Sequence, residues 1–171
     1  EPGFLERFLA ANLGSTTHVS VLDGDGRACS VTCTNGSSSG VVVPGTGIHL
    51  NNIMGEEDLN PHGFFSTPAG RRMPSMMAPT VVLGADGDVE LVLGSAGSNR
   101  IRSAILQVVV NVVDRELRAD AAIDAPRLHV EGGVLYAEPG AGLDGLERPG
   151  REIVRFREPN LFFGGVQAVE H

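Results

Sequence analysis

Two Asp-Gly turns, each set between runs of β-branched residues, restrict the folds open to this chain. The first is DGDG at 23–26, with β-rich runs at 18–23 and 27–34 on either side. The second, GADGD, lies within TVVLGADGDVELVLGS. Asp-Gly between such runs is a strong local signal for a β-hairpin. We predict two hairpins, and the near-continuous apolar strands of the second predict burial on both of its faces.

One long amphipathic helix is predicted after the second hairpin. Its apolar side chains recur every three or four residues, with Ser98 or Asn99 before them as the cap. The stripe consists of Ile101, Ala104, Ile105, Val108, Val109, Val112, Val113 and Leu117. Shorter helices are predicted at 1–13 and 120–125, and short strands at 133–137 and 152–156. Hairpins and helices in this order predict an α+β fold, with helices layered on a mostly antiparallel sheet.

The segment between the hairpins, 35–79, shows little periodicity and is rich in glycine, proline and serine. Irregular segments of this length are uncommon in compact domains and are usually functional or disordered. Because apolar and polar residues are mixed throughout, we predict an ordered functional loop.

The two cysteines, Cys29 and Cys33, are predicted to be free. Four residues along a strand span roughly 13 Å, which is too far for a disulfide. We predict that both thiols are buried.

The charge balance and the apolar pattern exclude several classes of partner. The net charge is −8, from 13 Lys+Arg against 21 Asp+Glu, so the chain repels nucleic acid and anionic membrane surfaces. The longest apolar stretch, 101–113, is interrupted by polar residues and is too short to span a bilayer. The five histidines are scattered, so we predict neither a metal site nor a cofactor.

The segment GSAGSNR at 94–100 joins the second hairpin to the long helix. Small residues there let backbone N–H groups point at an incoming oxygen, and the helix N-terminus adds partial positive charge. The lysine of a phosphate-binding loop is missing. The segment is therefore either an oxyanion site or a tight strand-to-helix turn.

Thr16 and Thr17 stand at the start of the first hairpin, after Gly14 and Ser15. Threonine has a high strand propensity, so a structural role would explain them. A threonine at the N-terminus of a chain also has its own base, because its free α-amine titrates near about pH 8. These local features leave a structural and a catalytic interpretation open.

Six segments taken together favour the catalytic interpretation. They are STTHVSVLDGDG, VTCT, LNN, RRMPSMMAPTVV, GSAGSNRI and DAPRLH. In this order and spacing they resemble the small-subunit half of γ-glutamyltranspeptidases, from residue 16 to about residue 129, with weaker agreement in the tail. The resemblance implies the N-terminal-nucleophile αββα sandwich, with this chain supplying about half of the layers.

Members of that family are precursors that cut themselves before the first threonine of the TTH motif. The resemblance places the cut between Ser15 and Thr16. Residues 1–15 would then end the large subunit, the implied partner, and 16–171 would form the small catalytic subunit. The resemblance also favours a periplasmic or secreted location and leaves a cytoplasmic one open.

The resemblance assigns roles residue by residue. Thr16 is the implied nucleophile, and the hydroxyl of Thr34 orients it. The backbone N–H groups of Gly97 and Ser98 correspond to the oxyanion hole. Ser75 corresponds to the first of two serines that bind the α-carboxylate of the donor, beside an arginine of the large subunit.

Several departures from the family pattern fall in the implied donor pocket. Many relatives have Leu-Asn where this chain has Asn35-Gly36, so the usual asparagine position is Gly36 and Asn35 lies one place early. Met76 replaces the second serine, and Ile53 replaces a residue that is often polar. The acylation residues are present, whereas the residues that hold the amino-acid end of the donor are altered.

The acidic partner of the donor's α-amine falls at Glu56, with Glu57 and Asp58 as rival placements. The resemblance implies γ-glutamyl transfer or hydrolysis from glutathione-like donors through a Thr16 acyl-enzyme, with water or an amine as acceptor. The altered pocket raises a glutaryl-type β-lactam acylase of the same family as an alternative. An uncleaved, inactive scaffold is a further alternative.

Overall fold

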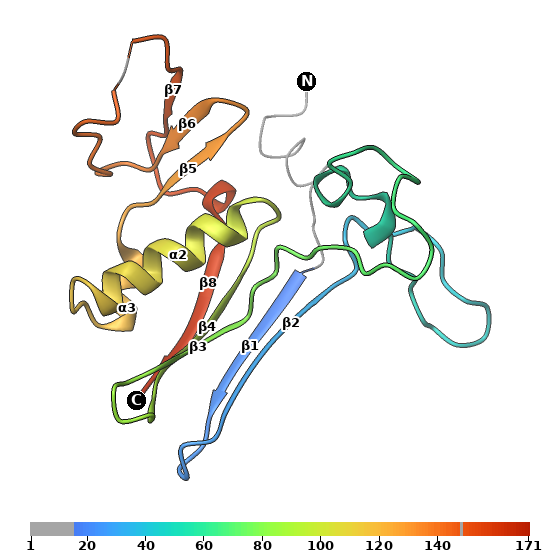
Figure 1. The fold of residues 1–171 in the computed structure, drawn as a ribbon, viewed down its shortest axis with the longest axis horizontal. Helices are drawn as coiled ribbons and strands as arrows, with labels where there is room; N and C mark the ends of the chain where they lie inside the picture. Colours follow the sequence, from blue (N-terminus) through green and yellow to red (C-terminus); the bar gives the residue numbers. More distant parts are fainter. Residues whose placement is uncertain (1–15, 148) are drawn as a thin grey trace. The chain divides into compact units, whose positions relative to one another are not determined.

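The computed structural model describes residues 16–147 and 149–171, so the helix predicted at 1–13 lies outside the described residues. The chain divides into two compact units. The described part of the first unit comprises residues 16–17 and 33–76, and the second unit comprises 18–32 and 77–171. Figure 1 shows the helices and strands of both units.

Strands β1 (Thr16–Leu22) and β2 (Ala28–Thr34) pair as the first predicted hairpin. The turn closes where the N–H of Asp23 donates to the carbonyl of Arg27 at 3.0 Å. The Asp23 carboxylate also forms an exposed ion pair with the Arg27 guanidinium at 2.8 Å. The Asp-Gly signal therefore located this turn correctly.

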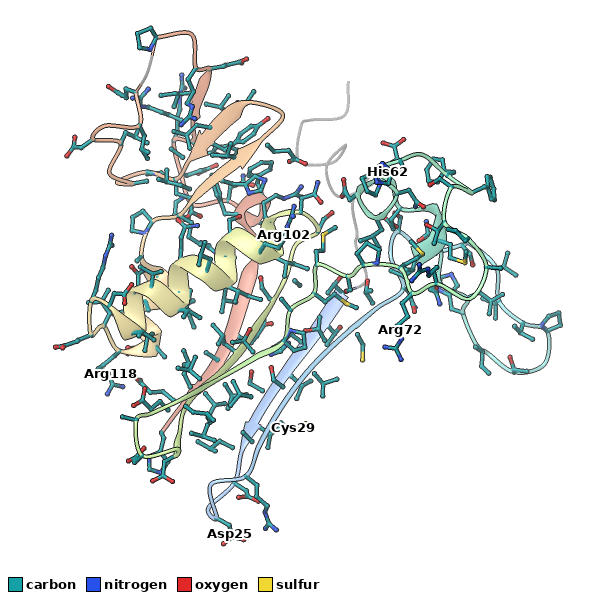
Figure 2. All side chains as sticks on the ribbon, in the orientation of Figure 1. Asp25, Cys29, His62, Arg72, Arg102 and Arg118 are labelled. Atoms are coloured by element: carbon teal, nitrogen blue, oxygen red, sulfur yellow. The ribbon has the colours of Figure 1, made fainter. Side chains whose placement is uncertain are left out.

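The outward face of this hairpin is apolar and exposed in this chain. On β2, the exposed residues are Cys29, Val31 and Cys33, at every second position. Figure 2 labels Cys29 on this hairpin. The prediction of buried thiols is wrong, because strand alternation places both cysteines on the exposed face. Both are free, as predicted.

The second hairpin forms most of the main sheet of the second unit. Strands β3 (Thr80–Leu83), β4 (Val89–Ala96) and β8 (Gly165–Glu170) are antiparallel, in the order β3-β4-β8. The central strand β4 has five consecutive buried residues, as predicted. The prediction of burial on both faces is wrong for β3, where Val81 and Leu83 are exposed, because β3 is an edge strand that alternates.

Helix α2 (Arg100–Val113) packs on this sheet, as Figure 1 shows. Its buried side chains join β4 and β8 in one core of Leu91, Leu93, Ile101, Ala104, Ile105, Val108 and Val166. The predicted stripe is too long at its C-terminal end: Val113 is 49% exposed, and Leu117 lies beyond the helix. The helix cannot continue because Glu116 adopts a left-handed conformation, with φ of 55°. Helix α3 (Ala119–Asp124) follows and confirms the short helix predicted at 120–125.

A smaller sheet in the same unit has the order β5-β6-β7. Strands β6 (Val134–Ala137) and β7 (Ile153–Arg155) match the two predicted strands and pair in parallel, whereas β5 (Leu128–Glu131) pairs with β6 antiparallel. A short 3-10 turn, η3 (Leu161–Phe163), leads into β8. The sequence did not predict β5 and β8, because β5 has only four residues and β8 is defined by its pairing with distant β4.

The described part of the first unit is largely irregular, as predicted. Beyond the strand ends, it has one isolated β-bridge, between Val42 and His49, and two 3-10 turns, η1 (Ile53–Gly55) and η2 (Glu57–Leu59). Backbone hydrogen bonds hold the bridged loop, including Leu50 N–H to the Val41 carbonyl at 2.9 Å. The segment is thus an ordered loop, as its mixed composition indicated.

Candidate active site

The first hairpin brings two threonine hydroxyls together in the first unit. Thr16 begins β1 and Thr34 ends β2, and their Oγ1 atoms lie 2.9 Å apart. Both residues are half-buried. The structure therefore pairs the two residues that the sequence predicted as nucleophile and orienting hydroxyl. Ser15, the other side of the predicted cleavage site, lies outside the described residues.

A backbone N–H also binds the Thr34 hydroxyl of this pair. The N–H of Gly36 donates to Thr34 Oγ1 at 3.0 Å. A hydroxyl has one proton to give and two lone pairs with which to accept. Beside this bond Thr34 keeps its own proton and one lone pair, so either hydroxyl of the pair can be the donor, and Thr34 is able to donate to Thr16 Oγ1. A donor at that oxygen stabilises the negative charge that develops when the proton of Thr16 is removed.

Gly36 adopts a left-handed conformation, with φ of 63°, and lies against two side-chain oxygens. A Cβ at this position would be 2.3 Å from Oδ1 of Asn52 and 2.6 Å from Oε1 of Glu56. Both oxygens therefore converge on the space that a side chain at position 36 would fill. Glycine is the residue that leaves this space open.

Two hydrogen bonds from Ser37 hold the carboxylate of Glu56 in place. It is half-buried between η1 and η2, and its Oε1 accepts from the N–H of Ser37 at 2.7 Å and from the Ser37 hydroxyl at 2.6 Å. Glu57 and Asp58 are exposed. Of the three acidic placements, Glu56 is thus the one whose carboxylate the structure brings to Gly36.

Asn52 was not singled out by the sequence reasoning. Its backbone N–H donates to the carbonyl of Asn35 at 3.2 Å, while its Oδ1 is buried and accepts no hydrogen bond from the described residues. Most buried polar atoms have a partner, so this oxygen marks a place for a donor. The sequence contains one signal for this residue, because Asn52 is the second asparagine of the LNN motif, which served above only as evidence for the family resemblance. Asn35 itself contributes its backbone here.

The predicted residues of the carboxylate clamp lie in the irregular stretch before β3. Ser75 is exposed and Met76 is half-buried, both in the first unit. Ile53, the apolar departure, is half-buried in η1. Their contact with a donor stays a prediction.

Gly97 and Ser98 form the turn between β4 and α2 in the second unit, with φ of 135° and 53°. The carbonyl of Gly97 accepts from Arg100 N–H at 3.1 Å, which closes the turn. Asn99 occupies the cap position, but its side chain donates to Glu131 and makes no cap hydrogen bond. The predicted cap position at Asn99 and the predicted tight turn are both confirmed, and the Asn99 side chain serves Glu131 instead of the helix. Its oxyanion role stays a prediction.

His18 packs against β4 within the second unit. It is 7% exposed, and a Cβ on Gly94 would lie 2.1 Å from its ring. Its Nδ1 lies 2.7 Å from Thr32 Oγ1 and its Nε2 2.9 Å from Ser20 Oγ. Burial lowers the pKa of His18, so the ring is held as a neutral imidazole at neutral pH. The two hydroxyls can satisfy a neutral ring, because each can donate or accept.

The sequence model of γ-glutamyltranspeptidases matches residues 6–171. The chain belongs to this family. Its relatives include the acylase ACY 1 proenzyme of Pseudomonas sp. strain SE83, 37% identical over 159 residues, and the glutathione hydrolase proenzyme of Escherichia coli K12, 40% identical over 126 residues. These matches cover 90% and 67% of this chain but only 28% and 22% of the relatives.

Solved structures of the family share the fold. An acivicin-inhibited γ-glutamyltranspeptidase matches with a TM-score of 0.74 at 34% identity, over 90% of this chain and 89% of that one. A cephalosporin acylase from Bacillus halodurans matches with a TM-score of 0.73 at 29% identity, over 90% of this chain and 29% of that one. The predicted α+β class and the N-terminal-nucleophile fold are confirmed.

The length of the match also bears on subunit composition. The chain spans only 22–29% of the proenzymes that it resembles, while it spans most of the chain in the acivicin-inhibited structure. This is consistent with one subunit of a cleaved precursor. Among the helices of the described residues, none has the length and apolarity that spanning a bilayer requires.

Proposed function

We propose that residues 16–171 of this chain form the small, catalytic subunit of an enzyme that transfers or hydrolyses γ-glutamyl groups from glutathione-like donors. The precursor would cut itself between Ser15 and Thr16, and the upstream segment, the large subunit, would remain as the partner. The proposal rests on family membership, on the Thr16–Thr34 hydroxyl pair and on the oxygens beside Gly36.

In this mechanism the freed α-amine of Thr16 takes the proton of its own hydroxyl as Oγ1 attacks the γ-carbonyl carbon. Thr34 donates to Oγ1, and the N–H groups of Gly97 and Ser98 receive the oxyanion. The proton then passes to the leaving amine as the amide C–N bond breaks, which leaves a γ-glutamyl ester on Thr16. Water or an acceptor amine attacks this ester and regenerates the free threonine. Covalent catalysis thus replaces one difficult amide exchange by two easier steps.

The convergence of Asn52 Oδ1 and Glu56 Oε1 at Gly36 supports a γ-glutamyl donor over other acyl donors. The α-ammonium group of a γ-glutamyl donor has a positive charge and three N–H donors. It would neutralise the carboxylate and supply the buried amide oxygen with the donor that it lacks. Asn52 therefore offers an oxygen in a pocket where Gly36 and Ile53 replace more polar family residues.

A glutaryl acylase is the second candidate, favoured by the acylase relatives and by the apolar replacements at Ile53 and Met76. A glutaryl group has no α-amine, so it would leave the oxygens of Asn52 and Glu56 without a cation. We therefore expect a preference for the γ-glutamyl donor of about one to two orders of magnitude in kcat/KM, or roughly 1.4–2.8 kcal/mol.

Paired γ-glutamyl and glutaryl p-nitroanilides test this choice on the full-length product. Glu56→Gln and Asn52→Leu should each reduce the preference, whereas Glu57→Gln, a matched change at an exposed neighbour, should leave it unchanged. Equal rates for both donors in the wild type would support the acylase instead. An unchanged preference in Glu56→Gln would show that the acidic partner lies elsewhere.

Mass spectrometry of the same preparations tests the nucleophile. We expect a free N-terminal Thr16 in the wild type, a γ-glutamyl adduct on that residue during turnover, and an intact, inactive Thr16→Ala precursor. An uncleaved wild type without turnover would support the scaffold alternative. Cleavage of Thr16→Ala at the same bond and at the normal rate would exclude self-cleavage by this hydroxyl.

A further inference from the structure

Two arginines in the second unit bind three successive backbone carbonyls at the end of η3. Arg100 Nε donates to the carbonyl of Phe162 at 3.0 Å. Arg127 Nη1 donates to the carbonyls of Phe163 at 3.3 Å and Gly164 at 2.9 Å. Carbonyls near the end of a helical turn have no partner within the turn, so these guanidinium groups fix the path of the chain into β8.

A buried carboxylate orients the second of these arginines. Arg127 Nε lies 3.3 Å from Oε2 of Glu138, and the same oxygen accepts from the backbone N–H of Arg127 at 2.8 Å. The two side chains are only 15% and 7% exposed. The desolvation of a buried ion pair offsets much of its attraction, so stability alone is a weak reason for it. Its clear structural effect is to aim the guanidinium at the carbonyls.

The stretch that the arginines hold lies directly against the turn between β4 and α2. The Cα of Gly164 is 2.6 Å from the point where a Cβ on Gly97 would be. In the other direction, a Cβ on Gly164 would be 2.8 Å from the carbonyl oxygen of Ala96. The two backbones therefore touch without any intervening side chain. A shift of Gly164 displaces Gly97.

The turn itself needs such support. Ser98 adopts φ of 53°, a left-handed conformation that is uncommon outside glycine and costs energy unless the surroundings impose it. The proposed function uses the N–H groups of Gly97 and Ser98 as oxyanion donors. Such donors act at 2.7–3.1 Å from the oxyanion, and a misplacement of about 1 Å can cost about a hundredfold in rate.

We infer that Arg127, oriented by Glu138 and assisted by Arg100, is a positioning residue for the Gly97–Ser98 oxyanion turn. It acts through the carbonyls of Phe163 and Gly164 and touches no substrate. The inference rests on the proposed function for the role of the turn, whereas the contacts themselves belong to the fold.

Arg127→Gln in the full-length protein removes the carbonyl contacts, but it also leaves Glu138 buried without its cation. The double variant Arg127→Gln/Glu138→Gln removes that charge as well. Its two amides can bond each other, and glutamine at 127 is too short to replace the arginine fork. Arg118→Gln is the matched control, because Arg118 is 79% exposed and pairs only at the surface with Asp120, 3.4 Å away (Figure 2).

Two measurements are made on the wild type and these variants. One is kcat and KM for γ-glutamyl p-nitroanilide, per mole of free N-terminal Thr16 counted by mass spectrometry. The other is hydrogen exchange of the backbone amides at 94–99. In the double variant we expect kcat to fall about ten- to hundredfold with KM within about threefold, and exchange at the turn to accelerate. Arg118→Gln should match the wild type in both.

A wild-type kcat in the double variant overturns the inference, whatever the exchange rates are. A wild type that does not turn over the anilide instead contradicts the proposed function. The exchange data then decide the structural part alone: faster exchange at 94–99 in the double variant supports the positioning contact, and equal exchange refutes it.

Discussion

Replacing Gly94 by alanine tests how the His18 ring is packed. At an open position, Gly→Ala stabilises a protein by about 0.4–1 kcal/mol, because it restricts the unfolded chain. Gly94 is not open: a Cβ there would lie 2.1, 2.2 and 2.7 Å from three atoms of the His18 ring. Strand β4 is paired on both sides, so its backbone has little freedom to retreat. The ring must move instead.

The cost follows from what the ring gives up. Displacing it breaks the hydrogen bonds of His18 with Thr32 and Ser20, each worth about 0.5–1.5 kcal/mol net. The sum, about 1–3 kcal/mol, equals the usual cost of overpacking a core. Subtracting the gain in the unfolded chain, taken at the midpoints of the two ranges, we expect Gly94→Ala to lower the free energy of unfolding by about 1.3 kcal/mol, and by at most about 2.6 kcal/mol.

Urea unfolding of the full-length protein, followed by circular dichroism, measures this loss as a shift in midpoint at constant slope. Gly24→Ala, in the turn of the hairpin that contains His18, is the control, because no atom lies within 4 Å of its added methyl. It should be neutral or slightly stabilising. In the double variant His18→Ala/Gly94→Ala, the methyl enters the space of the ring. The two changes should therefore couple by at least about 1 kcal/mol.

A Gly94→Ala protein as stable as Gly24→Ala would refute the packing described for His18. A loss of the expected size without coupling to His18→Ala would mean that the methyl clashes with a different group.

Three further predictions concern the site and its pH dependence. Thr34→Val removes the hydroxyl that hydrogen-bonds Thr16, so kcat should fall about ten- to hundredfold, or roughly 1.4–2.7 kcal/mol, while Thr17→Val at the exposed neighbour should be neutral; equal kcat values would contradict the orienting role. Gly36→Asn restores the residue that many relatives have, yet we expect kcat/KM for the γ-glutamyl donor to fall at least about tenfold, because the side chain displaces the oxygens beside Gly36; a gain in kcat/KM would be the opposite result. Burial lowers the pKa of His18 and of His129, so as the pH falls these histidines take up protons more readily in the unfolded chain than in the folded one. The free energy of unfolding should therefore be greatest above about pH 6.5 and fall as the pH drops through that value toward the folded pKa values, with a smaller fall in His18→Gln. A urea midpoint that does not change between pH 7 and 5 would contradict this.

The elements that the sequence predicted correctly are those with local signals. Each Asp-Gly turn is specified by a few adjacent residues, and the apolar stripe of α2 repeats within a single helix. The predicted end of that stripe is wrong, because Leu117 fits the period although the helix ends at Val113 and Glu116 beyond it adopts a left-handed conformation. The prediction that both thiols are buried is wrong for another reason. Alternation identifies which residues share a face, but not whether that face is covered.

The sequence by itself determined the two hairpins, the long helix and the threonine pair, because turn chemistry, periodicity and motif spacing act over short distances. Only the tertiary structure shows which of the three acidic candidates lies beside Gly36, since Glu56 reaches it through the 3-10 turns of an irregular loop. It also revealed that the side-chain oxygen of Asn52 accepts no hydrogen bond from the described residues, and that Arg127 donates to the carbonyl of Gly164 just before β8. Each of these contacts joins groups that are separated in the sequence and come together only when the chain folds, so no local sequence pattern predicts them.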